Sequence, residues 1–162
     1  MSIKIFVTGG TFEKEYNPKT QSLILEDTHV PEILDHSRTS VDVSIEKLML
    51  IDSLEMTDSD REDIVNKCKR APEDKILITH GTDTMVQTAA YIAERIKDKT
   101  IILTGAMYPY KLVDSDASFN LGSALAFVQL LPHGIYIVMN GRYYNWNNCQ
   151  KNHDKGRFEE VR

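Results

Sequence analysis

Two threonines that follow glycine turns are the residues of this sequence best suited to covalent catalysis. Thr11 comes after two glycines at the end of the apolar run IKIFVT, and Thr82 comes after His80 and a glycine at the end of the apolar run KILIT. A threonine hydroxyl becomes an effective nucleophile only when a neighbouring group takes its proton. Asp83, directly after Thr82, is a carboxylate that can belong to such a group. The two segments therefore predict a site at which a threonine attacks a substrate.

Alternating strand-like and helix-like segments predict that both threonines lie at one edge of a sheet. Apolar or alternating runs indicate strands at 3–8, 41–49, 75–79, 100–104 and 134–140. Apolar spacing and capping residues indicate helices at 31–36, 58–69, 84–96 and 117–131. This order predicts a single domain over 1–162 with a three-layer α/β fold, in which a mostly parallel, doubly wound sheet of the flavodoxin or Rossmann type carries helices on both faces. Ligands bind at the carboxyl edge of such a sheet.

The same edge is expected to carry groups that suit a small amino acid. Asp52 and Ser53 follow the second strand, and Ala106 follows the fourth strand through a Thr-Gly turn. Helix N-termini at this edge offer backbone N–H groups to an anion. Hydroxyl, carboxylate and N–H groups together fit a substrate that has both a carboxylate and an amino group. The residues therefore predict a small-molecule amino acid substrate.

Two segments do not fit the strand and helix pattern. Residues 12–28 are polar, contain Pro18, and are expected to form a hairpin or a mobile flap. Residues 141–162 are too polar for a core strand and carry aromatic and basic side chains that can grip ligands or partner chains. We expect this aromatic tail to form a subunit contact or a lid, and hence a homo-oligomer, either a dimer or a tetramer.

The composition argues against several other partners. The 162 residues carry a formal net charge of −5, which gives nucleic acid and anionic membranes no electrostatic attraction. No apolar stretch approaches the roughly 18 residues of a membrane span. Cys68 and Cys149 are expected to be reduced bystander thiols, which fits a cytoplasmic protein. The histidines show no spacing typical of metal ligands, so neither a metal nor an organic cofactor is expected.

Four short segments resemble the signature segments of bacterial L-asparaginases. They are TGGTF at 8–12, HGTDTM at 80–85, TGAM at 104–107 with Pro109, and SDASFNL at 115–121. The first two together, in the right order on the right elements, are a specific signal, whereas a single glycine–threonine turn is common. The resemblance is to a short-chain member that consists of the first domain only. It implies an amidohydrolase that converts L-asparagine to L-aspartate and ammonia through a threonine acyl-enzyme.

The resemblance also implies a role for the matching residues. Thr11 would be the nucleophile, and Tyr16, the tyrosine of the flap, would help to move its proton. Thr82 and Asp83 would belong to a second threonine–acid–lysine cluster, in which Asp83 also binds the substrate's amino group. Ser53 would hold the α-carboxylate, and backbone groups near Thr82 and the fourth strand would stabilise the oxyanion. The expected substrate-binding positions are Gly10, Asp52, Ser53, Gly81 and Ala106.

The sequence departs from the family pattern in its lysine. Members usually carry a catalytic lysine in the helix after the FNL segment, and the corresponding stretch here, GSALAFVQLL at 122–131, contains none. We expect a relocated lysine to serve. Lys151 is the first choice, because the tail around it resembles the family's segment after that strand, Lys14 is the second and Lys155 the third.

The amino-group ligand and the choice of substrate have alternatives. Longer members have a second domain that lends an acidic residue to a neighbouring subunit's site, and this sequence is expected to take that ligand from Glu13, Glu15 or a neighbouring chain. Leu54 and Tyr108 stand where the family usually has glutamine and arginine. An amidase that acts on another amide, such as glutamine, is therefore an alternative to an asparaginase.

Structural roles compete with the functional ones. His80 is expected to be a buried structural residue rather than a general base. Thr82 and Asp83 can cap the helix that follows them, and Asp114 and Asp116, with Ser115, are expected to cap the helix over 117–131. A chain that had lost the lysine altogether would be a non-catalytic amino-acid-binding module. A nucleotide-binding domain of the flavodoxin type ranks last, because the sequence lacks the phosphate-binding fingerprints.

Overall fold

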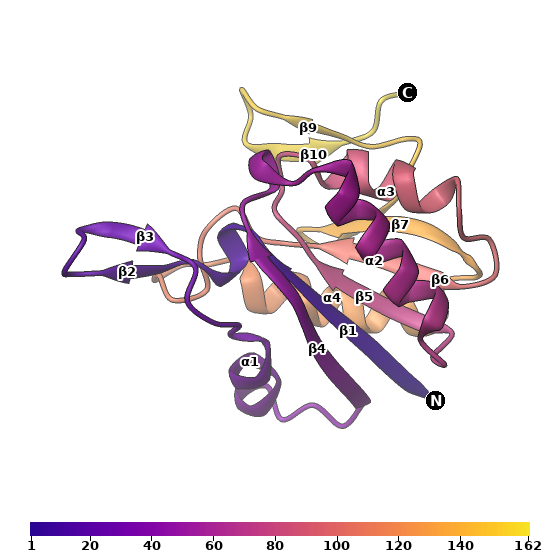
Figure 1. Cartoon of the computed structure of the whole chain (residues 1–162), viewed down its shortest axis with the longest axis horizontal. Helices are drawn as coiled ribbons and strands as arrows, with labels where there is room; N and C mark the ends of the chain where they lie inside the picture. Colours follow the sequence, from indigo (N-terminus) through magenta and orange to yellow (C-terminus); the bar gives the residue numbers. More distant parts are fainter.

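The centre of the molecule is a six-stranded sheet with the strand order β4-β1-β5-β6-β7-β8. The computed structural model describes all residues, 1–162. The sheet strands are β1 (Ser2–Gly9), β4 (Asp42–Ile51), β5 (Lys75–Thr79), β6 (Thr100–Thr104), β7 (Gly134–Met139) and β8 (Arg142–Asn145). Neighbouring strands from β4 to β7 run parallel, and β8 runs antiparallel to β7. The mostly parallel sheet expected from the sequence is confirmed (Figure 1).

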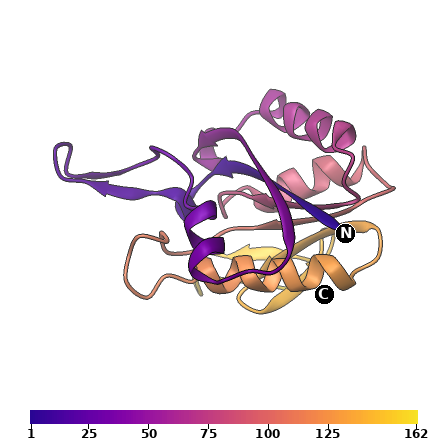
Figure 2. The same cartoon turned by 90° about the horizontal axis from the view of Figure 1, so that it is seen from below.

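Four helices cover the two faces of this sheet. They are α1 (Val30–His36), α2 (Asp58–Arg70), α3 (Met85–Ala93) and α4 (Ala117–Leu130). Figure 2 shows α2 and α3 on one face and α1 and α4 on the other. Because side chains alternate across a strand, β1 directs Phe6 into one apolar core and Ile5 and Val7 into the other. The three-layer α/β fold is therefore confirmed.

The start of α2 fixes the chain at the carboxyl edge of the sheet. The Thr57 hydroxyl accepts a hydrogen bond from the Asp60 backbone N–H at 3.2 Å, and the Asp60 carboxylate accepts one from the Thr57 N–H at 2.8 Å. This capping box satisfies donors that a helix start otherwise leaves unpaired. A short 3₁₀ turn, η2 (Ser53–Glu55), connects β4 to α2 and lies at the edge where the threonines are expected.

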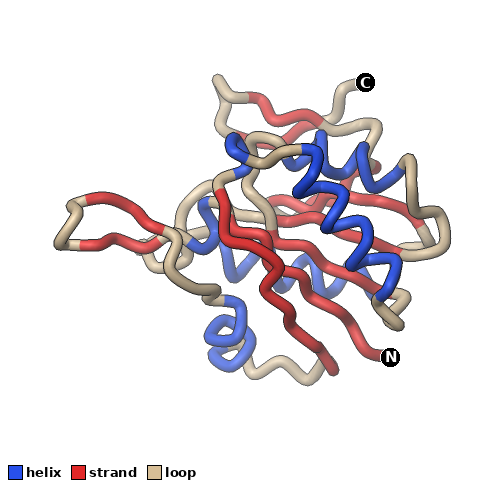
Figure 3. The backbone as a smooth tube through the Cα atoms, viewed as in Figure 1, coloured by secondary structure: helices blue, strands red, loops and turns tan.

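The segment after β1 forms the expected hairpin. A 3₁₀ turn, η1 (Thr11–Glu13), leads into β2 (Glu15–Asn17), which pairs antiparallel with β3 (Ser22–Ile24). The tube in Figure 3 shows this hairpin projecting from the body of the molecule. We call residues 12–28 the flap.

The C-terminal segment supplies an edge strand that the sequence pattern did not predict. β8 extends the sheet beyond β7, and only Tyr144 of its four residues is buried, which is why the segment reads as too polar for a strand. It is followed by a second hairpin, β9 (Gln150–Asn152) and β10 (Arg157–Glu159). None of the helices is long and apolar enough to cross a membrane.

Candidate active site

The two glycine turns meet backbone to backbone. Gly10 has a φ of 79°, and a Cβ placed on it would lie 2.4 Å from the Cα of Gly81. Glycine is therefore required at position 10 for both conformation and space. The Gly10 N–H also donates to the carbonyl of Ile51 at 2.9 Å. The ends of β1, β4 and β5 thus converge, and Thr11 and Thr82 each follow one of the touching glycines.

Lys151 lies against the second threonine. Its Nζ donates to Thr82 Oγ1 at 2.8 Å and to Asp83 Oδ1 at 2.7 Å. The Lys151 side chain is 12% exposed and Thr82 is 6% exposed, so their contact is largely shielded from water, whereas the Asp83 side chain is 32% exposed. β9 carries the lysine to the segment between β5 and α3. Lys155, from the same hairpin, pairs with Glu159 at 3.6 Å and does not join the cluster.

Lys14 is engaged with Asp52. Its Nζ lies 2.8 Å from Asp52 Oδ2, while Oδ1 accepts the Leu54 N–H at 3.1 Å and caps η2. The hydrogen bond from Lys14, followed by that from Leu54, holds the pKa of Asp52 below its usual range. The Asp52 carboxylate expected to meet the substrate is thus already bound by two groups of the chain.

Ser53 sits beneath the Thr82 turn. It is buried, its Oγ accepts the Thr84 N–H at 3.4 Å, and its carbonyl accepts from the Thr84 hydroxyl at 2.8 Å. A Cβ on Gly81 would lie 2.6 Å from Ser53 Oγ. These contacts bring Ser53, Gly81 and Thr82 together at one edge.

The structure does not bring Tyr16 to this cluster. Tyr16 is 58% exposed and lies on β2, in the hairpin that projects from the body (Figure 1). Thr11, by contrast, begins η1 at the base of the flap and is only partly exposed. Thr11, just before the flap, and Tyr16, within it, therefore lie in different surroundings.

Glu13 is not available as a substrate ligand, which corrects that expectation. Its side chain is fully buried and accepts hydrogen bonds from the Thr28 hydroxyl at 2.9 Å and the His29 N–H at 2.5 Å. Burial raises its pKa to about 7. Glu13 ties the two ends of the flap to each other instead. Glu15 stays on the hairpin at β2.

The carboxylate of Asp116 faces the loop after β6 and not the start of its own helix, which corrects the expected cap. It accepts from the backbone N–H groups of Met107 and Tyr108 at 3.0–3.1 Å, and the Ser115 hydroxyl accepts from Ala117 N–H in its place. Asn120, for which the sequence pattern predicts no such role, donates to the Gly105 carbonyl at 2.8 Å. These groups fix the loop that presents Ala106.

His80 is buried with no exposed surface. Its Nδ1 donates to the Gly81 carbonyl at 2.7 Å and its Nε2 lies 2.8 Å from Thr88 Oγ1. Burial lowers its pKa to about 4, so the ring is neutral near pH 7. A ring enclosed in this way fits the structural role expected from the sequence.

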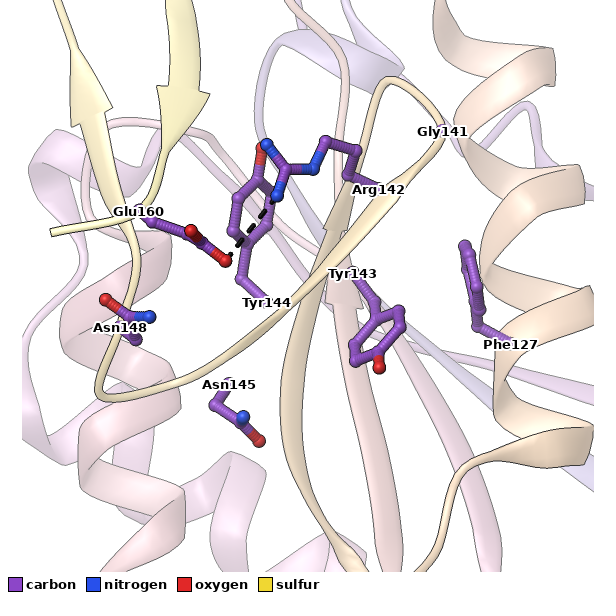
Figure 4. Close-up of a pocket in the computed structure, with 8 residues that line it drawn as sticks. All are labelled: Phe127, Gly141, Arg142, Tyr143, Tyr144, Asn145, Asn148 and Glu160. Carbon is purple, nitrogen blue, oxygen red and sulfur yellow. Dashed lines mark hydrogen bonds and ion pairs between the residues drawn. The ribbon is translucent and has the colours of Figure 1, made fainter. Parts of the chain in front are cut away.

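A separate cavity of about 380 Å³ lies beside β8 (Figure 4). Arg142 pairs there with Glu160 at 3.5 Å, and the Tyr143 and Phe127 rings pack 5.2 Å apart. None of its lining residues belongs to the threonine–lysine cluster. The cavity is therefore distinct from the edge where the glycine turns meet.

The sequence and the fold both match known asparaginases. The family model described as asparaginase, N-terminal, matches residues 2–158. L-asparaginase 1 of Escherichia coli (strain K12) is 32% identical over 170 residues, covering 96% of this chain and 48% of that protein. A glutamyl-tRNA(Gln) amidotransferase subunit of Methanococcus vannielii is 31% identical over 151 residues, covering 86% of this chain and 34% of that protein. The solved structure of the thermostable L-asparaginase from Thermococcus kodakarensis has a TM-score of 0.88 and 25% identity, covering 99% of this chain and 51% of that one.

Proposed function

Because the chain belongs to the asparaginase family and matches the family's N-terminal part, we propose that it hydrolyses L-asparagine to L-aspartate and ammonia through a threonine acyl-enzyme. The observation that carries the proposal is the contact of Lys151 with both Thr82 and Asp83. A lysine, a hydroxyl and a carboxylate in one hydrogen-bonded cluster can move a proton during acyl transfer. We propose Lys151, which the C-terminal hairpin carries, as the lysine of the site.

The first step is attack by Thr11. Its Oγ forms an ester with the side-chain carbonyl carbon, and the amide nitrogen, after gaining a proton, leaves as ammonia. Water then hydrolyses the ester, which releases L-aspartate and restores the hydroxyl. The contact between Gly10 and Gly81 supports this scheme, because it sets the turn that carries Thr11 against the turn that carries Thr82.

Thr82 is proposed to pass the proton to the leaving nitrogen. A positive charge beside a hydroxyl lowers the free energy of its deprotonated form. The Lys151 ammonium, 2.8 Å from Thr82 Oγ1, supplies that charge in a shielded position. Asp83 accepts from the same ammonium and keeps it in place.

Substrate recognition is assigned to groups around the same turn. Asp83 Oδ1 is bound to Lys151, so Oδ2 is proposed to bind the α-ammonium group. Ser53 is proposed to meet the α-carboxylate. Backbone N–H groups at Thr82 and near Ala106 are proposed to face the oxyanion. Electrostatic stabilisation of the oxyanion is usually the largest single contribution to the rate of acyl transfer.

The test is ammonia release from L-asparagine by the purified chain, beside Thr11→Ala and the control Thr20→Ala on the exposed flap turn. We expect release by the wild type and the control and none above background by Thr11→Ala. Binding of L-asparagine by calorimetry without any release would contradict the proposal and indicate a non-catalytic amino-acid-binding module.

One relative is a glutamyl-tRNA(Gln) amidotransferase subunit, and this favours a second candidate substrate. An amidase of this fold could release ammonia from another amide, such as glutamine. One additional methylene in a pocket changes specificity by about 1–3 kcal/mol. The ratio of kcat/KM for L-asparagine to that for L-glutamine decides between the two substrates.

We also propose that the chain forms homo-oligomers and works in the cytoplasm. Tyr16 and Leu23 lie directly opposite each other on β2 and β3 and are both exposed, and Leu54 and Tyr108 are exposed on η2 and after β6. An exposed apolar pair on a projecting hairpin is available to pack against a second chain. Both cysteines are free and buried, which suits a reducing compartment. Sedimentation at several concentrations tests the assembly, and a monomer throughout would contradict it.

A further inference from the structure

A chain of buried hydrogen bonds runs from α2 to the Thr82 turn. Arg61 Nε donates to Thr88 Oγ1 at 2.9 Å, Thr88 lies 2.8 Å from His80 Nε2, and His80 Nδ1 donates to the Gly81 carbonyl at 2.7 Å. His80 and Thr88 have no exposed surface, and Arg61 is 7% exposed. We call Arg61, Thr88 and His80 the relay. No step of the proposed reaction uses these residues.

Beside the relay, Met56 Sδ lies 3.1 Å from His80 Nε2 and 3.5 Å from Thr88 Oγ1, and because a thioether has no hydrogen to donate, Thr88 is the donor available to Nε2. The Gly81 oxygen accepts, so His80 Nδ1 must carry the hydrogen, and the neutral ring then has an acceptor at Nε2. The Thr88 hydroxyl donates to that nitrogen while its oxygen accepts from Arg61, whose guanidinium never loses its charge. Each buried group is therefore paired, and the tautomer of His80 is set by its neighbours.

The last bond of the relay fixes a peptide plane at the site. A trans peptide is planar, so its N–H points opposite to its C=O. Holding the Gly81 carbonyl against His80 therefore turns the Thr82 N–H away from the imidazole. There is also no room for a side chain at position 81, because the backbone of Gly81 packs against Gly10 and Ser53. The orientation of Thr82, and of Asp83 after it, is thus coupled to the buried imidazole.

We propose that Thr88 and His80 are positioning residues, which lock the Gly81–Thr82 peptide so that Thr82 faces both the substrate and Lys151. This inference rests on the proposed function for its kinetic test, but its structural part does not depend on activity.

The test compares Thr88→Val with Thr88→Ser and with Thr100→Val. Thr88→Val keeps the shape of the side chain and removes the hydroxyl with its contacts to Arg61, His80 and Met56, whereas Thr88→Ser keeps the hydroxyl. Thr100 is an equally buried threonine at the opposite edge of the sheet, where its hydroxyl lies 3.3 Å from the Leu131 carbonyl. We expect kcat to fall about tenfold or more in Thr88→Val. Thr88→Ser and Thr100→Val should stay within about threefold of the wild type.

A second readout is the ¹⁵N NMR spectrum of the His80 ring at pH 7. The proposal predicts hydrogen on Nδ1 and an accepting Nε2 in the wild type, and a shifted Nε2 resonance in Thr88→Val, in which Nε2 has lost its donor. Hydrogen on Nε2 in the wild type, or unchanged kcat in Thr88→Val, would overturn it. If the wild type releases no ammonia, the proposed function fails separately. Calorimetry with L-aspartate then tests the relay: weaker binding by Thr88→Val supports it, and unchanged binding overturns it.

Discussion

The turns after β5 and β1 both present a glycine and a threonine, yet the chain holds them in different ways. The β5 turn is supported from three sides: Lys151 on β9 binds Thr82 and Asp83, Ser53 lies beneath Gly81, and His80 holds the Gly81 carbonyl.

The β1 turn instead leads into a hairpin that projects from the body and carries Tyr16 in an exposed position. On the β5 side, therefore, charges and dipoles are already in place before a substrate binds. Such prearranged groups need no reorganisation when charge develops in a transition state.

The largest effect is expected on the β1 side, from Thr11→Ala. Removing a nucleophile from a cooperative catalytic group lowers kcat by about 10⁴-fold or more. Folding should be unaffected, because Thr11 lies in a partly exposed turn. Single-turnover kinetics and thermal unfolding measure the two quantities. If Thr11→Ala stayed active, Thr82 would be assigned as the nucleophile, and the roles of the two turns would be reversed.

The next largest effect is expected on the β5 side, from Lys151→Met. Loss of a group that supports proton transfer lowers kcat by about 10²–10⁴-fold. Lys155→Met is the matched control, since Lys155 lies on the same hairpin but pairs only with Glu159. Steady-state kinetics of both variants provide the comparison. Near wild-type rates in Lys151→Met would direct attention to Lys14.

Glu13 gives the β1 side a pH dependence of stability that is opposite in sign to the one His80 gives the β5 side. Its pKa is raised to about 7 by burial, so the folded state keeps a proton that the unfolded state has lost. The Glu13 contribution to the free energy of unfolding should therefore fall as pH rises from about 4.5 to about 7 and level off above that, whereas His80, whose pKa is lowered from 6.5 to about 4, should contribute a rise between those two values. The raised pKa corresponds to about 3 kcal/mol across this window.

The free energy of unfolding of the wild type minus that of Glu13→Gln isolates the Glu13 contribution and should fall with rising pH over that range, and urea unfolding at a series of pH values measures it. Glu15→Gln, on the exposed hairpin, serves as the control and should retain the wild-type profile. A difference between the wild type and Glu13→Gln that does not change with pH would contradict a raised Glu13 pKa.

The smallest effect is expected from Tyr16→Phe. If the flap tyrosine helps to move the Thr11 proton, acylation should slow by about tenfold, which corresponds to about 1.4 kcal/mol. Tyr143→Phe, at a partly exposed tyrosine on β8, should leave the rate unchanged. Pre-steady-state release of ammonia distinguishes acylation from later steps. An unchanged rate in Tyr16→Phe would leave the tyrosine as part of a cover over the site.

The elements and the two turns could be predicted because local patterns encode them. Apolar runs and caps gave five sheet strands and four helices, and the position of β8 was missed because a half-exposed edge strand has no apolar run. Lys151 could be named only through resemblance, since its contact with Thr82 joins residues that lie 69 positions apart.

The supporting residues of the site had no local signal. In the sequence, Arg61 and Thr88 are polar positions on two helices with no sign of a shared role. Only the packing of α2 against α3 brings Arg61 to Thr88, and Thr88 in turn contacts His80. Asp116 reads as a helix cap, but its carboxylate satisfies the N–H groups of the loop after β6. Such roles depend on how elements meet, which a single sequence does not specify.

The most direct test of the acyl-enzyme is mass spectrometry of the chain quenched during turnover of L-asparagine. The account predicts an aspartyl ester on the peptide that contains Thr11, which is absent from Thr11→Ala and lost as substrate is exhausted. An ester on the peptide that contains Thr82, or ammonia release with no ester on either threonine at any quench time, would contradict it.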